Sequence, residues 1–213
     1  MNLRSLNFSI PKIYPITDVR LSGLSHTEQT KRLIGGGVRI VQFREKHSSP
    51  LDWFNDARSA VRLCQTNSVI SIVNDRVDIA LAIGADGVHL GQTDLPPDAA
   101  RRILGERAVI GYSTHSIEQA RQAAGMDIDY LAFGPIFPTT TKADVDEIVG
   151  LELLRKVKGI VGDLPLVAIG GIDIVNASSV FTAGADSIAV IGAIAAGGSN
   201  ITERARKFTT EFA

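Results

Sequence analysis

Short runs of apolar, often β-branched residues alternate along this chain with longer segments that have helical spacing. The pattern is clearest in the middle of the chain, where the run 69–73 ends in Asn74-Asp75, a helical segment follows, and a second run, 88–90, ends shortly before Asp94. A strand, a helix and a strand in this order form a crossover unit, which predicts parallel strands. Because parallel strands end at the same edge of a sheet, Asp75 and Asp94 are expected to face the same space.

The same alternation extends over the rest of the chain. Strands are predicted at residues 13–17, 38–43, 69–73, 88–90, 108–112, 129–133, 166–169 and 187–191. Helices are predicted at residues 24–34, 49–65, between 75 and 84, and at 94–104, 116–124, 151–157, 175–183 and 202–212. A loop at residues 134–150 interrupts the alternation.

A recurring motif indicates how many strands there are. A helix that ends near glycine, a turn and an apolar strand recur at Val38, Ala85, Ile128 and Ala185. Each interval spans two strand–helix units, because one unit takes roughly 20–25 residues in a barrel of about 200–250 residues. The sequence therefore predicts an α/β fold, a (β/α)₈ TIM barrel. Residues 1–213 form a single domain in this interpretation, and residues 1–11 precede the first strand.

An open, doubly wound sheet is the alternative fold. Such a sheet more often has a glycine-rich fingerprint after its first strand. The segment that follows the first predicted strand here, Thr17-Asp18-Val19-Arg20, is not one. The barrel is therefore the favoured fold.

Composition narrows the classes of function. The chain has 213 residues, of which 45% are hydrophobic, and a net charge of −1 gives no sign of a nucleic-acid or anionic-membrane partner. No apolar run approaches the about 20 residues of a membrane span, and residues 1–11 are too short and polar for a signal peptide. The single cysteine, Cys64, cannot form an internal disulfide, which favours a reducing, cytoplasmic location.

Polar residues follow the predicted strands, where a barrel has its active site. If extended geometry continues past the second strand, Gln42, Arg44 and Lys46 share one face. Arginine and lysine together suit a pyrophosphate group. The alternative is a solvated loop in which the two cations pair with Glu45.

Asp75 and Asp94, with the amide of Asn74 beside them, suit a hard cation such as Mg²⁺. Magnesium usually shares its ligand shell with substrate phosphates, which favours a phosphate site nearby. The alternative is that these residues cap the helices that follow them. Capping would explain each residue singly, but not why both lie beside a cationic strand end.

Two further features suit phosphate groups. The segment Thr139-Thr140-Thr141-Lys142 lies on a loop too long for a plain connection, and hydroxyls and amides near a lysine bind phosphate well. Gly171 and Gly192 follow the seventh and eighth strands, where barrels often hold a phosphate on backbone amides. A solvated loop and ordinary tight turns are the alternatives.

Tyr14, His89 and Ser113 complete the set of residues near strand ends. His89 lies within an apolar strand and His115 in a helix-capping segment, and a packing or capping role is the more frequent one for such histidines. Trp53 and Cys64 are predicted to be core residues on helix faces.

These motifs together resemble those of the thiamine phosphate synthase family, which joins the pyrimidine and thiazole halves of thiamine. The similarity extends from about Tyr14 to Phe208. Its specific pieces are the segments 42–46, 74–75, 89–94, 134–142 and 168–172.

The resemblance implies a Mg²⁺-dependent transferase that couples 4-amino-5-hydroxymethyl-2-methylpyrimidine diphosphate with a carboxylated thiazole phosphate. Pyrophosphate leaves first, in a dissociative step. By similarity, the pyrimidine diphosphate site contains Gln42, Phe43, Arg44, Glu45, Lys46, Asn74, Ser113 and Lys142, to which the strand-end residues Tyr14 and His89 are added. Asp75 and Asp94 would hold Mg²⁺, and the thiazole phosphate site would contain Thr139, Thr140, Thr141, Gly171, Ile191 and Gly192.

Arg44, Lys46 and Lys142 are the expected catalytic residues, because departure of pyrophosphate needs positive charge where negative charge develops. The partners are then small-molecule substrates, and whether the chain forms a homo-oligomer is left open. The family often has a serine where this chain has Gly192, which removes a hydroxyl from the thiazole phosphate site but leaves the backbone amide.

Two other functions are compatible with this fold. A thiazole tautomerase would use a histidine as proton carrier, and His115 is the candidate, although tautomerase-like members tend to lose the cation and aspartate motifs that this chain keeps. A non-catalytic regulator that binds thiamine phosphate would need the phosphate site, but neither Lys142 nor both aspartates.

Overall fold

The computed structural model describes residues 8–139 and 147–212, and its strands close into one parallel barrel. The strands are β1 (Ile13–Thr17), β2 (Ile40–Phe43), β3 (Ile70–Asn74), β4 (Gly87–Leu90), β5 (Val109–Thr114), β6 (Tyr130–Phe133), β7 (Leu166–Ile169) and β8 (Ser187–Val190). Each strand pairs with the next, and β8 pairs with β1. The predicted (β/α)₈ barrel is therefore confirmed.

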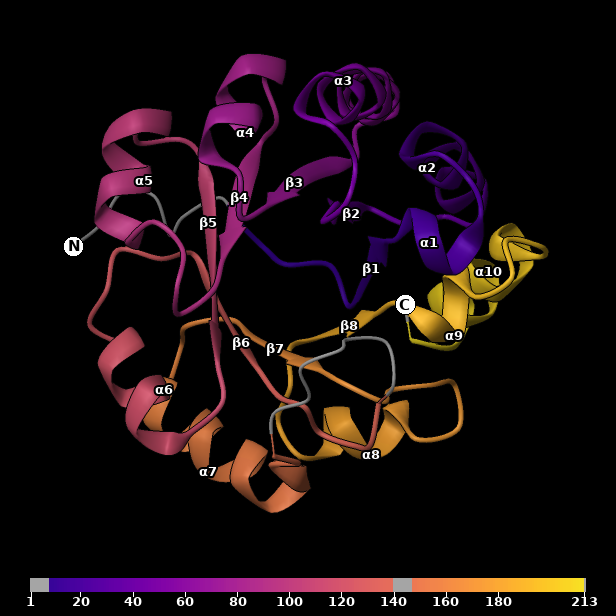
Figure 1. Cartoon of the computed structure of the whole chain (residues 1–213). Coiled ribbons are helices and arrows are strands. Elements are labelled where there is room, and N and C mark those ends of the chain that lie inside the picture. The colour runs from indigo at the N-terminus through magenta and orange to yellow at the C-terminus, as the bar shows by residue number, and fades with distance from the viewer. Residues whose placement is uncertain (1–7, 140–146, 213) are drawn as a thin grey trace.

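Helices form a ring around the strands, as the view along the barrel shows (Figure 1). They are α1 (Val19–Ser22), α2 (His26–Gly35), α3 (Pro50–Thr66), α4 (Val77–Ile83), α5 (Pro97–Leu104), α6 (Ile117–Ala123), α7 (Gly150–Val161), α8 (Ala177–Thr182), α9 (Gly192–Ala195) and α10 (Ile201–Glu211). The sequence pattern does not predict α1, because four residues are too few to show a helical period.

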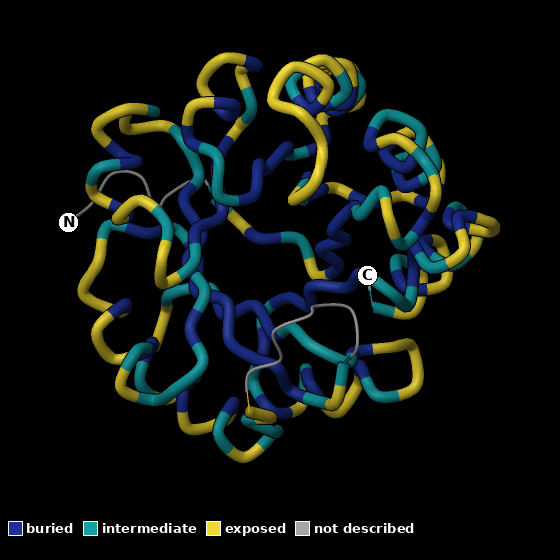
Figure 2. The backbone as a smooth tube through the Cα atoms, in the orientation of Figure 1, coloured by how far each residue is buried: buried dark blue, intermediate teal, exposed yellow. Residues whose placement is uncertain are grey.

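Apolar side chains pack in two layers. In β6, Tyr130 and Ala132 point into the barrel interior, whereas Leu131 and Phe133 belong to the layer between strands and helices. This alternation follows from the two-residue period of a strand. The strands are accordingly buried along their length, and exposed backbone lies mainly on the outer ring (Figure 2).

Local signals in the sequence set where several helices begin and end. Ser49 caps α3 by accepting a hydrogen bond from the Asp52 amide, and Pro50 occupies the first turn, as predicted. Gly84 ends α4 in the left-handed conformation that glycine adopts without strain. Among the described residues, no helix combines the length and apolar character that crossing a membrane requires.

Strand β5 is longer than the sequence predicts. It continues to Thr114, because Ser113 and Thr114 pair with Ala132 and Phe133 of β6. Ser113 therefore lies within a strand rather than in a helix-capping loop. Its side chain is held at the carboxyl end of the barrel by the sheet itself.

Substitution of two glycines, one in a crowded place and one in an open place, tests the packing between strands. A Cβ on Gly87 would clash with the carbonyl of Val109 on the neighbouring strand, whereas one on Gly159 of α7 would meet nothing within 4 Å. We expect Gly87→Ala to lower the free energy of unfolding by about 1–3 kcal/mol through overpacking. Gly159→Ala should raise it by about 0.5–1 kcal/mol, because alanine favours the helix. Urea unfolding measures both, and a Gly87→Ala variant as stable as the parent would contradict this packing.

Candidate active site

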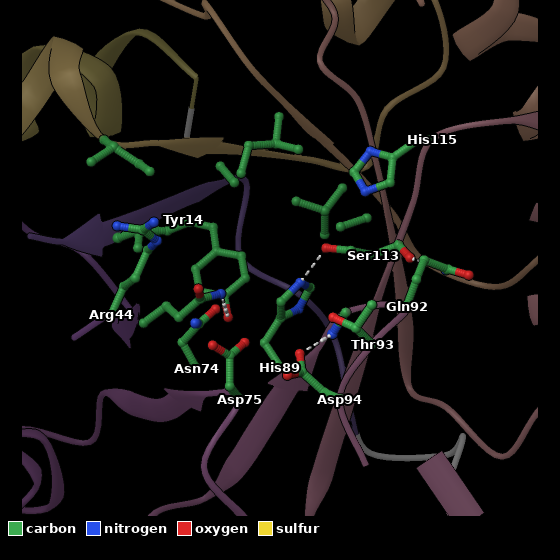
Figure 3. Close-up of a pocket in the computed structure, with 18 of the residues that line it drawn as sticks. Tyr14, Arg44, Asn74, Asp75, His89, Gln92, Thr93, Asp94, Ser113 and His115 are labelled. Carbon is green, nitrogen blue, oxygen red and sulfur yellow. Dashed lines mark hydrogen bonds between the residues drawn. The ribbon is translucent and has the colours of Figure 1, made fainter. Parts of the chain in front are cut away.

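A cavity of about 460 Å³ opens at the carboxyl ends of the strands, a size typical of ligand sites (Figure 3). The predicted residues that line it are Tyr14, Gln42, Arg44, Lys46, Asn74, Asp75, His89, Asp94, Ser113 and Ile191. They come from strands on several sides of the barrel or from the residues that follow those strands. These ten predicted residues therefore share one space, whereas their role as a site stays a prediction.

The cavity also contains residues that the sequence analysis does not single out as site residues. The apolar side chains are Ile16, Ala132, Val167, Ile169 and Ala189, and the polar ones are Gln92, Thr93 and Gln119. Gln92 donates a hydrogen bond of 2.6 Å to the backbone oxygen of Ser113, which ties the loop after β4 to β5. The position of Gln92 directly after an apolar strand is the signal that identifies it.

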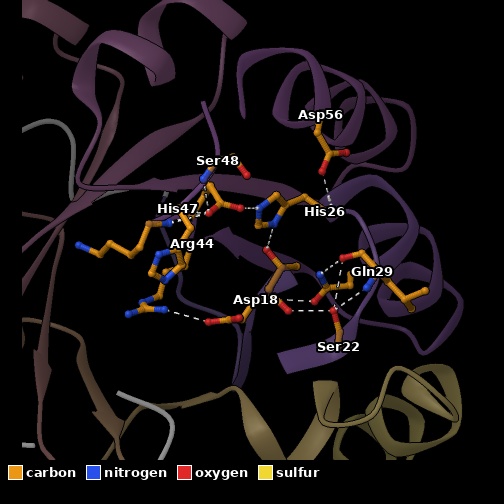
Figure 4. Close-up of polar contacts among 12 residues, drawn as sticks. Asp18, Ser22, His26, Gln29, Arg44, His47, Ser48 and Asp56 are labelled. Atoms are coloured by element: carbon orange, nitrogen blue, oxygen red, sulfur yellow. Dashed lines mark hydrogen bonds and ion pairs between the residues drawn. The ribbon is translucent and has the colours of Figure 1, made fainter. Parts of the chain in front are cut away.

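Arg44 is fixed at the cavity by an ion pair that spacing along the chain does not reveal. Its guanidinium donates to the Asp18 carboxylate at 2.9 Å, as Figure 4 shows. The same carboxylate caps α1 by accepting from the Leu21 amide at 3.0 Å. Asp18 directly follows β1, just as Asp75 follows β3, so its strand-end position is the signal that points to it.

Asp75 and Asp94 lie where the crossover pattern predicts, after the paired strands β3 and β4. The backbone of Asp75 has a positive φ of 63°, and its amide donates to the His89 carbonyl at 2.8 Å. A left-handed conformation in a residue other than glycine carries strain, and such strain concentrates at functional sites. The Asp75 carboxylate contacts the Lys46 ammonium, and the Asp94 carboxylate accepts from the Gly91 amide at 2.7 Å.

Neither aspartate caps the helix that follows it. The residue at the N-cap of α4 is Arg76 and that of α5 is Pro96, and neither helix has a side-chain capping bond. The capping alternative for Asp75 and Asp94 is therefore wrong. Their carboxylates lie at the cavity instead.

The environment of Asp75 suits a cation. Burial is the largest influence and raises the pKa of Asp75, the neighbouring Asp94 carboxyl raises it further, and the Lys46 ammonium opposes both by lowering it. Asp75 and Asp94 are partly buried, and their negative charges repel each other. A divalent cation would relieve that repulsion, so the two carboxylates suit one as ligands. Within the described residues no group of three or more His, Cys, Asp or Glu side chains could hold a metal ion.

Two residues of the segment 42–46 have side chains that point away from the cavity. The Phe43 side chain is fully buried in the layer between strands and helices, because it alternates with Gln42. The Glu45 carboxylate turns toward α2, where one oxygen lies 3.5 Å from His26 Nε2. The predicted contact of these two side chains with a ligand in the cavity is not supported, and the alternative in which Arg44 and Lys46 pair with Glu45 is wrong.

Glu45 instead holds the loop after β2 in shape. One carboxylate oxygen accepts from the amides of Lys46, His47 and Ser48 at 2.8, 2.6 and 3.0 Å. The contact with His26 is the largest influence on the pKa of Glu45, and together with the amides of His47 and Ser48 it lowers that pKa well below the usual range, although burial opposes the shift. This loop carries Arg44 and Lys46 into the cavity.

His26 is itself held in the protein interior. It is 1% exposed, and its Nδ1 lies 2.7 Å from the Thr17 hydroxyl, which donates to the Gln42 carbonyl at 3.1 Å. A buried polar connection therefore runs from β1 and β2 through His26 to Glu45. Buried polar groups with partners on several elements fix the elements relative to one another.

None of the predicted thiazole phosphate residues that the structure describes, apart from Ile191, lines the cavity. Gly171 has a φ of 62°, and a Cβ there would clash with Phe137 and Pro138, so the backbone after β7 packs closely against the start of the loop 134–150. Gly192 begins the short helix α9. The described residues that line the cavity do not include Thr139, Gly171 or Gly192, and Thr140, Thr141 and Lys142 lie outside the described residues. The phosphate site stays a prediction.

His115 also lines the cavity. Its Nδ1 lies 2.7 Å from the Gly134 carbonyl, which accepts a hydrogen bond and so directs Nε2 away from that carbonyl. The backbone amide of His115 donates to the Gln119 side chain at 2.7 Å. The carbonyl after β6 therefore orients the ring, and α6 holds the backbone of His115.

Comparison with known proteins gives consistent matches. A family model described as thiamine monophosphate synthase matches residues 13–194. The thiamine-phosphate synthase of Chloroflexus aurantiacus is 45% identical over 92% of this chain and 90% of its own length, and that of Methanospirillum hungatei is 44% identical over 92% and 95%. The solved structure of a thiamine phosphate pyrophosphorylase from Pyrococcus furiosus superposes with a TM-score of 0.84, at 36% identity, over 93% of this chain and 94% of that one.

The contacts of Glu45 predict how stability depends on pH. Because its pKa is lower in the folded than in the unfolded protein, its contribution is present above the ordinary value of 4.5 and is lost as pH falls below it. Glu45→Gln should lower the free energy of unfolding at pH 7 and should reduce the loss of stability on acidification. Urea unfolding between pH 7 and pH 3 measures this.

Glu203→Gln is the matched control, because Glu203 is exposed and pairs with Lys207 on the surface of α10 at 3.4 Å. Such a surface pair contributes little. If Glu45→Gln and Glu203→Gln gave the same stability at every pH, the Glu45–His26 contact would have no energetic role.

Proposed function

Because the chain belongs to the thiamine monophosphate synthase family, we propose that its cavity joins 4-amino-5-hydroxymethyl-2-methylpyrimidine diphosphate to a carboxylated thiazole phosphate. The products are thiamine phosphate and pyrophosphate. The observation that carries this proposal is the charge at one rim of the cavity, where Arg44 and Lys46 lie beside the carboxylates of Asp75 and Asp94. A diphosphate together with a divalent cation matches that arrangement of charge.

The reaction has two bond changes. The bond between the pyrimidine methylene carbon and the diphosphate oxygen breaks, and its electron pair leaves with pyrophosphate. The thiazole nitrogen then donates an electron pair to the methylene cation and forms the new carbon–nitrogen bond. The amino group of the pyrimidine ring stabilises the cation between the two events.

Arg44 and Lys46 assist the first event by placing positive charge at the oxygens on which negative charge develops. Asp18 holds Arg44 at 2.9 Å, so the guanidinium is oriented before substrate binds. Asp75 and Asp94 would hold Mg²⁺, which when bound supplies further positive charge to the pyrophosphate oxygens. Glu45 supports these residues indirectly, by shaping the loop that carries Arg44 and Lys46.

The apolar part of the cavity serves the second event. Ile16, Val167 and Ile169 line the interior side of the site and present no polar side-chain atoms. A methylene cation reacts readily with water, so an apolar wall that excludes water protects it until the thiazole attacks. The flat pyrimidine ring fits such a wall better than the charged rim.

A thiazole tautomerase is the second candidate, and the observation that favours it is the place of His115 at the cavity with an oriented ring. A tautomerase needs one proton carrier and has no use for paired cations and carboxylates. The charged rim therefore favours the coupling reaction over isomerisation.

Metal removal tests the role of the aspartates. EDTA should abolish formation of thiamine phosphate and added Mg²⁺ should restore it. Asp75→Asn keeps the size of the side chain but removes its charge, and we expect kcat to fall by about 10²–10³, the usual scale for one preorganised electrostatic group. Asp78→Asn is the matched control, because Asp78 is exposed and pairs with Arg76 on α4. Full activity in a chelated, metal-free sample would exclude this role.

Separate assays of coupling and isomerisation distinguish the two candidate functions. Arg44→Ala should lower kcat for thiamine phosphate formation by about 10² or more, since a preorganised charge is lost. His115→Ala should retain most of the coupling activity. Arg102→Ala serves as control, because it removes an exposed guanidinium that pairs with Asp98. The tautomerase interpretation would be correct if no preparation formed thiamine phosphate and His115→Ala abolished isomerisation of the thiazole phosphate.

A further inference from the structure

A continuous line of hydrogen bonds crosses the barrel interior, and four of its five residues line the cavity. Gln42 Nε2 lies 3.0 Å from the Tyr14 hydroxyl, which lies 2.8 Å from the Tyr130 hydroxyl. The Tyr130 hydroxyl lies 2.9 Å from His89 Nδ1, and His89 Nε2 lies 2.8 Å from the Ser113 hydroxyl. Five strands thus contribute one residue each, and the line ends at the cavity, where Figure 3 shows Ser113 bonded to His89.

Tyr130 lies at the centre of this line and is held firmly. Its ring stacks on the His89 ring at 5.5 Å and meets the Tyr14 ring edge-on at 5.8 Å. Phe8 stacks on it at 6.3 Å, and the absence of a side chain at Gly111 leaves the space that its phenol occupies. Tyr130 is fully buried, so its hydroxyl has a fixed set of neighbours.

The donors and acceptors along the line give it a direction. The amide nitrogen of Gln42 only donates, so the Tyr14 oxygen accepts from it. Burial raises the pKa of both Tyr14 and Tyr130, so each phenol keeps its one hydrogen. Among the described residues the Tyr14 hydroxyl has only Gln42 and Tyr130 as hydrogen-bond partners, so its hydrogen has an acceptor only if it is donated to Tyr130. The Tyr130 hydrogen is then left for His89 Nδ1.

The imidazole continues the same direction. Since His89 Nδ1 accepts, the ring carries its hydrogen on Nε2 and donates it to the Ser113 oxygen. Ser113 then has its own hydrogen to donate to a group in the cavity. In the opposite direction, Ser113 would donate to His89 and would present only lone pairs to a ligand.

We infer that Tyr130 is a positioning residue that acts through His89, setting the Ser113 hydroxyl as a hydrogen-bond donor to the substrate. The consequence for catalysis rests on the proposed function. The oxygens of the departing pyrophosphate are acceptors, and a donor aimed at them binds more strongly as negative charge develops. If the Ser113 hydroxyl donated to His89 instead, its lone pairs would face the pyrophosphate oxygens and repel them.

The tautomer of His89 tests the direction without any substrate. In ¹⁵N-histidine-labelled protein at neutral pH, the nitrogen chemical shifts and one-bond couplings of His89 should show hydrogen on Nε2 and none on Nδ1. Tyr130→Phe should give a mixture of tautomers, whereas Tyr112→Phe, which removes a phenol hydroxyl from the outward side of β5, should leave the tautomer unchanged. Hydrogen on Nδ1 of His89 in the unaltered protein would overturn the inference.

Kinetics then separate a positioning role from a structural one. Ser113→Ala should lower kcat by about 10²–10³, and Tyr130→Phe should lower it by about tenfold with little change in KM, because the donor is misdirected rather than lost. The double variant should be no slower than Ser113→Ala, since Tyr130 acts only through that hydroxyl. Losses that multiply in the double variant would overturn the inference.

The two experiments keep this inference distinct from the proposed function. If the unaltered protein formed no thiamine phosphate, the proposed coupling reaction would be wrong, while the tautomer of His89 would still decide the direction of the line. If the protein formed thiamine phosphate and Tyr130→Phe matched Tyr112→Phe in kcat, the positioning role of Tyr130 would be excluded.

Discussion

Closure of the sheet is the constraint on which the site depends. The first strand pairs with the last, with Ile13 opposite Ile188 and Pro15 opposite Val190. A closed parallel barrel has no free edge, and all of its strands end at one rim. Residues that lie far apart in the sequence, such as Tyr14 and Ile191, therefore line the same cavity. In an open sheet with the same sequential strand order, the first and last strands would lie at opposite edges and would share no site.

Charged side chains at the rim of the cavity are paired with one another. Arg44 is bound to Asp18, and Lys46 contacts Asp75, so the two cations that face the cavity are oriented by carboxylates that belong to other strand ends. Glu45 lies between Arg44 and Lys46 in the sequence but pairs with neither of them, because its carboxylate contacts His26. A ligand that carries both negative charge and a divalent cation would satisfy cations and carboxylates together.

The barrel interior combines an apolar wall with one polar line. Branched aliphatic residues such as Ile40, Ile72 and Val167 belong to the interior cluster, as is usual for a barrel. Tyr14 and Tyr130 are buried in the same cluster, yet their hydroxyls have hydrogen-bond partners on both sides. A buried polar line whose members are satisfied is rigid, and it transmits a defined hydrogen-bond direction to the cavity. The interior therefore supports both the exclusion of water and the orientation of a polar group.

The sequence by itself determined most of the elements, the number of strands and which charged residues follow them. These features follow from local rules, because strand and helix periods are set by neighbouring residues and a crossover connection implies parallel strands. The same rules brought Asp75 and Asp94 to adjacent strand ends, where the structure has them. They also grouped Gln42, Arg44 and Lys46 on the face that lines the cavity.

Only the tertiary structure decided where several side chains point once a strand has ended. Alternation puts Glu45 on the face opposite Arg44, but its partner there, His26 of α2, comes from another part of the chain, as does Asp18, which binds Arg44. Tyr130 gave no signal in the sequence, because a tyrosine in an apolar strand is usual and its partners lie on β1 and β4. The physical reason is that side-chain direction beyond a strand, and the partner of a buried hydroxyl, depend on groups that closure of the barrel brings from distant parts of the chain.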